Sequence, residues 1–388
     1  MSALATAAPQ DFARVHRCTA PKPLSAGGLQ ATRLSLGRRG KYDRAGERME
    51  HGKIVRAYVG TMNVVEEHEI YLPGSGEEFI GTKGSKASLP VAANSKKVRN
   101  LSGHVHRAEV QSITSVIRGE IEIVASVDAY GKVQVSRNGE GVSKSEQGEY
   151  MEESWAGIDF GDNGASIITA HYCGRRLALY DVAVGKTTSK VYTAMTPTAV
   201  CSFNNVLIGC AEATCLSLWD IRGPATEGHC PLVGRADVSS LHKKLLFCVA
   251  HPEQDGAGHL LLAAGADRTV YGVDMRTWKI AHRWRSPLKY EAIGLALSPS
   301  MPSTCYVAGL DNDILCGVWG NPRVPHQPKV ANEASKSKLF QNHHCGFRGD
   351  SRWVGLAAYS EDGLSDTVVG VCDSGSLYII ENAEVMKV

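Results

Sequence analysis

Three side chains that could bind a metal stand together near the C-terminal end of the chain. His343, His344 and Cys345 are consecutive, and His326 precedes them. Imidazole and thiolate groups are the donors that zinc prefers. No second cluster with ligand spacing follows, so we interpret these residues as a solvent-facing loop and expect no metal.

A glycine-bearing segment superficially similar to a phosphate-binding loop occurs at 76–83, GEEFIGTK. The required order is Gly-Lys-Ser/Thr, whereas here Thr82 precedes Lys83. We therefore interpret it as a surface loop and expect no cofactor. No nucleophile elbow, no His-Glu-x-x-His and no paired-carboxylate motif is present, so we predict that the chain is not an enzyme.

Charge and cysteine usage restrict the partners and the compartment. Residues 1–48 hold nine basic and three acidic side chains, whereas residues 49–388 hold 33 basic and 37 acidic ones. This balance disfavours direct binding of a nucleic acid by residues 49–388. The sequence has no apolar run of 18 or more residues, so we predict no membrane span. The eleven cysteines form no C-x-x-C pair, which indicates a reducing compartment, the nucleus or the cytoplasm.

The first 48 residues differ from the rest in composition and show no periodic apolar pattern. A disordered tail, an organelle transit peptide and translation from Met49 all fit them. We therefore predict an N-terminal extension over 1–48 and a folded domain over 53–388. Deleting 1–48 is expected to leave thermal stability nearly unchanged.

From Lys53 onward the chain reads as short strands separated by turn residues, and the strand–turn pattern repeats. Six copies share one register, and a more degenerate seventh covers 53–98. The copies span 121–138, 167–182, 206–221, 261–276, 306–321 and 368–382. The last strand of each copy contains an equivalent position that is tryptophan in two copies and another residue in the rest. The residues at this position are Ser136, Tyr180, Trp219, Val273, Trp319 and Ile380.

This repeat resembles that of the WD40 family. Trp219-Asp220 is a complete Trp-Asp pair, and Trp319 and Asp274 are partial matches. The family's structural histidine and aspartate correspond to His104, Asp267 and Asp313. The resemblance implies an all-β, seven-bladed β-propeller behind a disordered N-terminal extension, with buried His–Asp–Trp sets inside the blades. It also predicts that Trp219 is buried.

We expect the ring to close through residues 53–60, KIVRAYVG, because SLYIIEN near the C-terminus leaves little chain for a fourth strand. Closure of this kind removes two open sheet edges.

Two basic features are candidate partner-binding sites. Trp219-Asp220-Ile221-Arg222 resembles a box that contacts the adaptor of cullin-RING ubiquitin ligases in some family members, and Arg276 occupies the matching place one blade on. The proline-bearing loop 321–350 is the second feature. Its candidate residues are Arg323, Lys329, Lys336 and Lys338.

The sequence therefore predicts a protein-interaction scaffold or adaptor, a monomer within a larger complex. A substrate receptor of a cullin-RING ligase is one version of this function. The alternative is an assembly factor of ribonucleoprotein particles or ribosomes. Organelle import through residues 1–48 stays open.

Overall fold

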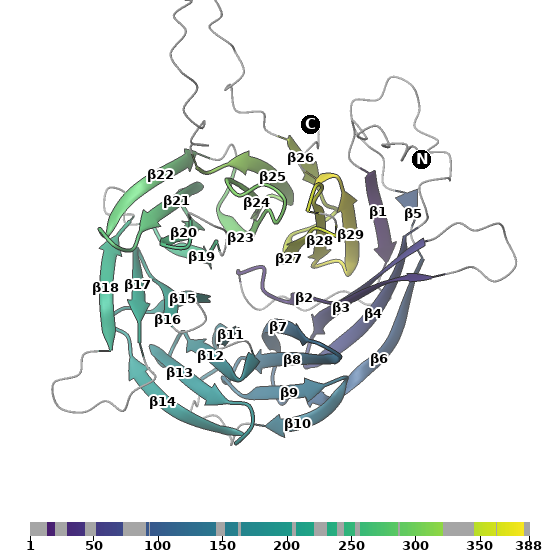
Figure 1. Cartoon of the computed structure of the whole chain (residues 1–388), viewed down its shortest axis with the longest axis horizontal. Helices are drawn as coiled ribbons and strands as arrows, with labels where there is room; N and C mark the ends of the chain where they lie inside the picture. The colour runs from purple at the N-terminus through teal and green to yellow at the C-terminus, as the bar shows by residue number, and fades with distance from the viewer. Residues whose placement is uncertain are drawn as a thin grey trace, which may run out of the picture.

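The computed structural model describes residues 14–19, 29–42, 52–72, 91–92, 94–144, 152–161, 164–203, 207–220, 231–238, 244–252, 257–285, 288–320, 345–361 and 363–383. These residues form seven sheets arranged radially around one axis, with all strand pairs antiparallel except that of β1 with β5 (Figure 1). The predicted all-β, seven-bladed propeller is confirmed.

Each of the first four blades is a four-stranded sheet, numbered here from the inner strand outward. Blade 1 consists of β2 (Leu34–Tyr42), β3 (Gly52–Thr61), β4 (Val64–Leu72) and β6 (Asn94–Val105). Blade 2 consists of β7 (Val110–Arg118), β8 (Ile121–Asp128), β9 (Val133–Arg137) and β10 (Glu140–Lys144). Blade 3 consists of β11 (Ala156–Gly161), β12 (Ser166–His171), β13 (Arg176–Asp181) and β14 (Lys186–Tyr192). Blade 4 consists of β15 (Pro197–Phe203), β16 (Leu207–Glu212), β17 (Cys215–Trp219) and β18 (Leu232–Asp237).

The remaining three blades include the one that closes the ring. Blade 5 consists of β19 (Leu246–Ala250), β20 (Leu260–Gly265), β21 (Thr269–Asp274) and β22 (Lys279–Arg285). Blade 6 consists of β23 (Ala292–Leu297), β24 (Thr304–Gly309), β25 (Asp313–Val318) and β26 (Cys345–Arg348). Blade 7 has five strands, β27 (Trp353–Tyr359), β28 (Thr367–Cys372), β29 (Ser376–Glu381), β1 (Arg14–Thr19) and β5 (Val91–Ala92).

The second strand of each blade is packed on both faces by its neighbouring blades. All six residues of β20 and of β28 are buried, whereas β14, an outermost strand, has no buried residue. Small side chains such as Ala263 and Ala264 let adjacent sheets approach closely. The core is thus a series of apolar layers between blades, which no single sheet could form alone.

A left-handed residue recurs at the turn between the second and third strands of every blade. These residues are Met62, Gly131, Arg175, Ala213, Arg268, Asn312 and Gly375, with φ between 42° and 86°. Glycine and asparagine adopt this conformation at little cost, whereas other residues are mildly strained in it. The backbone therefore repeats in all seven blades, although the residue types do not.

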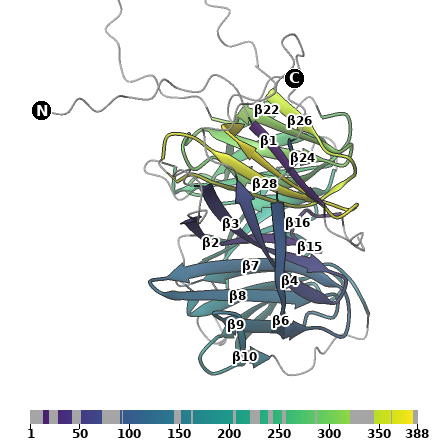
Figure 2. The same ribbon diagram turned by 90° about the vertical axis from the view of Figure 1, so that its right-hand side faces the viewer.

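The strand that closes the ring is β1, not residues 53–60. Arg14–Thr19 pairs antiparallel with β29, from Arg14 opposite Glu381 to Thr19 opposite Ser376 (Figures 1 and 2). Residues 53–60 lie in β3 instead, between β2 and β4 of blade 1. The predicted position of the closing strand was wrong because a strand this far upstream carries no repeat signature of its own.

The predicted extension over 1–48 therefore contains two propeller strands, β1 and β2, so the domain does not begin at residue 53. Val15 of β1 is buried in the apolar layer between blades 6 and 7, and Cys18 is buried in the layer between blades 7 and 1. On the other edge of β1, β5 pairs in parallel with His16 and Arg17.

Residues 29–33, which we call the channel segment, cross the axis of the ring. In Figure 1 the chain lies inside the ring just before β2. The backbone and side chains of this segment hydrogen-bond to five blades. The contacts, all 2.7–3.0 Å, join Ala31 to Ile293, Thr32 to Gln111 and Ile113, Arg33 to Val354 and Gly60, and Gln30 to Thr198. The side chain of Arg33 is buried and pairs with Glu109. The N-terminal part of the chain therefore closes the ring at its rim and crosses its centre.

We predict that deleting residues 1–20 destabilises the propeller strongly, contrary to the sequence-based expectation for residues 1–48. The deletion removes six strand pairings, leaves the edge of β29 unpaired and exposes the pockets of Val15 and Cys18. The midpoint of thermal unfolding, followed by circular dichroism, should fall by about 5 °C or more. An unchanged midpoint would show that β1 is dispensable.

Candidate partner-binding surfaces

The two faces of the disc carry different connections. The upper face is defined as the one that carries the turns between the second and third strands of each blade and the connections from one blade to the next. The lower face carries the turns between first and second and between third and fourth strands. Among the predicted structural residues, His104, Trp219 and Trp319 are buried, and Asp220, Asp267, Asp274 and Asp313 are half-buried. The predicted binding residues lie on the lower face or outside the described residues.

His104 is buried at the junction of blades 1 and 2, where it joins two serines. Its Nδ1 lies 2.6 Å from Ser126 Oγ and its Nε2 lies 2.9 Å from Ser136 Oγ. Ser126 also bonds His106, which in turn contacts Asp128 at 3.2 Å. Burial, with smaller contributions from His106 and Lys144, lowers the pKa of His104 to about 3, so the imidazole is neutral in the folded protein. The sequence spacing predicted that His104 pairs with position 136 of the third strand, and the hydrogen bond to Ser136 is observed.

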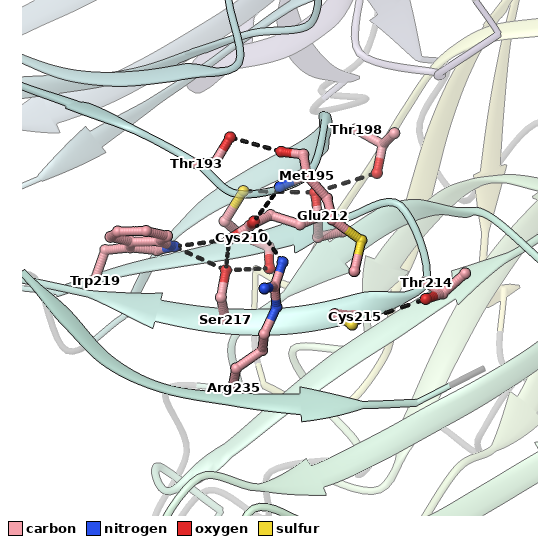
Figure 3. Close-up of polar contacts among 11 residues, drawn as sticks. Thr193, Met195, Thr198, Cys210, Glu212, Thr214, Cys215, Ser217, Trp219 and Arg235 are labelled. Carbon is pink, nitrogen blue, oxygen red and sulfur yellow. Dashed lines mark hydrogen bonds and ion pairs between the residues drawn. The ribbon is translucent and has the colours of Figure 1, made fainter. Parts of the chain in front are cut away.

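Trp219 ends β17 and is buried, as predicted, with 5% of its surface exposed. Figure 3 shows its indole nitrogen directed at Glu212 and Ser217, with N–O distances of 3.0 and 2.8 Å. The Glu212 carboxylate also accepts from Ser217, from the guanidinium of Arg235 at 2.8 Å and from the amide of Met195 at 3.3 Å. A fully buried carboxylate thus connects three strands of blade 4.

Glu212 was not among the predicted structural residues, although the sequence contained a signal for it. It ends the second strand of its blade, and Asp128 and His171 end the second strands of blades 2 and 3. A polar residue recurs at this point in three consecutive repeats, where the neighbouring positions are apolar or small. The family spacing places the aspartate six residues before the tryptophan, which is Ala213 in this repeat, one residue after Glu212.

The assignments in blade 6 need correction by two residues. Asp267 follows Gly265 in blade 5 and accepts from the Tyr271 hydroxyl and the Thr269 amide, the latter at 3.1 Å. Strand pairing aligns Gly265 with Gly309, which makes Asp311 the counterpart of Asp267 and Asp313 a strand residue. The same pairing places Gly317, not Trp319, at the position equivalent to Trp219.

The physical reason is the ring of Trp284, which comes from the outer strand of blade 5. A Cβ on Gly317 would lie 2.0 Å from this ring, so no side chain fits at that position. Trp319 is nevertheless buried, and its ring meets His282 edge-on at 5.7 Å between centroids. An aromatic from the adjacent blade has thus taken the place of the repeat's own tryptophan.

Arg276 is exposed on the lower face, and its guanidinium forms an ion pair within the same turn. Its Nε and Nη2 donate to the two carboxylate oxygens of Asp274 at 3.1 and 2.8 Å. This hydrogen bonding lowers the pKa of Asp274 to about 2. A partner at this place would meet a preformed ion pair.

Arg222, Arg323, Lys329, Lys336 and Lys338 lie outside the described residues, as do His326, His343, His344 and the loop 76–83. Asp220 is described and its amide donates to Pro231 at 2.8 Å. Among the described residues, no group of three or more His, Cys, Asp or Glu is placed to hold a metal ion, and no helix is long and apolar enough to cross a membrane.

The channel segment separates two cavities on the axis. A cavity of about 80 Å³ lies on the upper side, where Trp155 and Phe247 contribute to its wall. A wider cavity of about 580 Å³ opens on the lower side. Its polar wall consists largely of hydroxyl groups, and Asp159 there accepts from Thr114 Oγ1 at 3.3 Å and from the Ser202 amide at 2.7 Å. Asp159 thereby links blades 2, 3 and 4, which indicates a structural role for this carboxylate.

The upper face displays exposed aromatic side chains at the ends of strands and connections. The tyrosines among the exposed large hydrophobic residues of the described chain, Tyr172, Tyr192 and Tyr290, all lie there, and Met62 is exposed on the same face. Arg107 stacks on Tyr130 at 5.8 Å, and Lys289 on Tyr290 at 5.2 Å. This composition is typical of surfaces that bind other proteins.

Comparison with known proteins agrees with the architecture. No protein-family model and no curated protein matches the sequence. Many solved structures share the fold, including a chain of "Crystal Structure of Mitotic Checkpoint Complex", with a TM-score of 0.62 over 98% of both chains. The chain has the seven-bladed β-propeller fold. The identity to that structure is 11%, so the likeness concerns the fold alone.

We predict that Trp219→Ala lowers the free energy of unfolding by about 3 to 5 kcal/mol, because it leaves a cavity and removes a donor from the buried Glu212. Denaturant unfolding of the variant and of Trp219→Phe, which keeps most of the ring, measures the two contributions. A loss below about 1 kcal/mol in Trp219→Ala would contradict the described packing.

We predict that His104 makes the fold sensitive to mild acid. Its pKa is lower in the folded than in the unfolded chain, so the unfolded chain takes up the proton first and stability falls from about pH 6.5 downward. His104→Gln, which keeps a hydrogen-bonding side chain, should reduce the loss of unfolding free energy between about pH 7 and pH 5 by up to about 2 kcal/mol. Denaturant titrations of both proteins at the two pH values provide the measurement. An identical pH dependence would show that His104 does not titrate as described.

Proposed function

We propose that this chain is a protein-binding scaffold that holds its partners on the faces of a closed disc. The observation that carries the proposal is the set of exposed tyrosines on the upper face, Tyr172, Tyr192 and Tyr290. Tyrosine supplies a large contact area at low entropic cost and is enriched where proteins bind one another. The channel segment supports the proposal, because it occupies the axis and leaves the faces and rim for binding.

The charges of the upper face favour a protein over a nucleic acid. On this face the exposed cations Arg107, Arg175, Lys244, Arg268 and Lys289 occur together with the exposed carboxylates Glu152, Glu153, Asp237 and Asp350. A nucleic-acid surface requires a continuous positive patch, because the ligand is negative along its whole length. Assembly factors of ribonucleoprotein particles remain the alternative class, and the experiment below tests for them.

A second, more specific function is adaptor binding for a cullin-RING ubiquitin ligase. The observation that favours it is Arg276, exposed on the lower face and fixed by Asp274. Arg222 closes the matching Trp-Asp-x-Arg box one blade earlier in the sequence. A fixed arginine can offer its remaining donors to a partner carboxylate with little loss of entropy.

One affinity experiment tests both functions. The tagged wild type, an upper-face variant (Tyr172→Ser with Tyr290→Ser) and a lower-face variant (Arg222→Glu with Arg276→Glu) are purified from cell extract, and captured proteins are quantified by mass spectrometry. We expect the upper-face variant to lose a defined group of wild-type partners and the lower-face variant to lose a ligase adaptor. Surface changes of this kind should cost under about 0.5 kcal/mol of stability, which circular dichroism checks.

The possible outcomes separate the proposals. If both variants keep every wild-type partner, neither face is the binding surface and the scaffold proposal fails as stated. If the wild type captures no ligase adaptor, the ligase function is wrong while the scaffold function stands. If nuclease treatment removes all partners, the assembly-factor alternative replaces both.

A further inference from the structure

A hollow of about 400 Å³ lies on the upper face between blades 5 and 6. One wall is the turn after β20 and the other is the connection from β22 to β23. The charged and aromatic side chains that line it are Lys244, Arg268, Lys289, Tyr290, Asp267 and Glu291. Its volume suits one or two side chains of a partner rather than a folded element.

Arg268 is held in place by the backbone of the opposite wall. Its Nη1 donates to the carbonyl oxygens of Leu288 and Lys289, both at 3.3 Å. A guanidinium has five donor hydrogens, and within the described residues Nε and Nη2 of Arg268 have no hydrogen-bond partner. The part of the group left uncommitted is the edge that binds a carboxylate through two parallel bonds.

Lys289 and Tyr290 form a second, adjacent feature of the hollow. The Lys289 ammonium lies 5.2 Å from the centroid of the Tyr290 ring, and 48% of the Tyr290 surface is exposed. The Lys289 amide donates to Asp311 at 2.9 Å, which fixes the connection that carries both residues. A cation and an open aromatic face therefore stand beside the Arg268 guanidinium on a tethered backbone.

The two carboxylates of the hollow do not cancel these cations. Asp267 accepts from the Tyr271 hydroxyl and the Thr269 amide, so its oxygens are already engaged with blade 5. Asp267 keeps its charge in these hydrogen bonds with neutral donors, so three cations face two carboxylates and the hollow has a net charge of +1. This arrangement attracts a single acidic side chain, whereas a nucleic acid with a phosphate at every residue would also meet Glu291.

We propose that this hollow binds an acidic segment of a partner protein, with a carboxylate on Arg268 and Lys289 and a neighbouring apolar side chain on Tyr290. The inference deepens the proposed scaffold function and rests on it. The carboxylate replaces water on the uncommitted donors of Arg268, and Tyr290 supplies the contact area.

The conformation of Arg268 provides a variant that separates binding from folding. Arg268 has a φ of 62°, which glycine adopts without strain, and this relief offsets the loss of the two hydrogen bonds to Leu288 and Lys289, so we expect Arg268→Gly to fold. Arg175 occupies the equivalent turn in blade 3 with a φ of 42° and is exposed, but it does not line the hollow. Arg175→Gly is therefore a control that removes the same charge from the same kind of turn.

The test measures the fluorescence anisotropy of a labelled peptide of glutamate and leucine titrated with the full-length protein, beside a matched peptide of glutamine and leucine. We expect the glutamate peptide to bind the wild type and Arg175→Gly equally, within about twofold. We expect Arg268→Gly to weaken binding by about tenfold or more. Tyr290→Ser should weaken it less, and thermal midpoints of all variants verify folding.

Equal affinity for the two peptides, or an equal loss in Arg268→Gly and Arg175→Gly, would overturn the inference. So would tighter binding of a labelled single-stranded oligonucleotide that depends on Arg268. If the peptide does not bind while the affinity experiment shows partners lost from either face variant, this inference fails and the scaffold function stands. If the peptide binds through Arg268 while both face variants keep every partner, the hollow is a binding site and the scaffold proposal as stated is the one that fails.

Discussion

The structure depends on one antiparallel strand pairing, that of β1 with β29. Blade 7 takes its fourth strand from the other end of the chain, so one sheet joins the first and the last described strands. Six residue pairs form this junction. Side chains reinforce it, because Arg17 donates to Ser376 Oγ at 3.0 Å and His16 contacts Glu381 at 2.9 Å. The stability of every other blade is tied to this junction, since each blade buries its faces only against its neighbours.

Within this ring, the blades satisfy the same requirement with different chemistry. Blade 2 uses a neutral His104 between two serines, blade 4 uses the Glu212 carboxylate, and blade 5 uses Asp267 with a tyrosine hydroxyl. Buried polar groups must be paired, but physics does not prescribe which groups pair. Sequence motifs can therefore disappear from a repeat while the backbone geometry, including its left-handed turn, remains.

The residues at the axis of the disc stabilise the ring, whereas those on its upper face are available to partners. The channel segment ties five blades together at the axis, and the cavities beside it are bounded by hydrogen-bonded hydroxyl groups and by Asp159. Exposed aromatic residues and cations stand instead on the turns of the upper face, which the strands beneath them hold rigid. A rigid support lowers the entropic cost of binding, so the turn residues are the ones we assign to partners.

The sequence alone determined the fold class, because strand periodicity, turn residues and a repeat in one register are local properties. It also located Trp219 and His104, whose hydrogen-bond partners Ser217 and Ser136 stand 2 and 32 positions away in the sequence. Only the tertiary structure decided the closing strand, the channel segment and the identity of the polar sets. β1 meets β29 across 365 positions of sequence between His16 and Glu381, a distance that no local pattern encodes. The shift from Trp319 to Gly317 likewise arises from Trp284 of the neighbouring blade, since packing between blades is a property of the assembled ring.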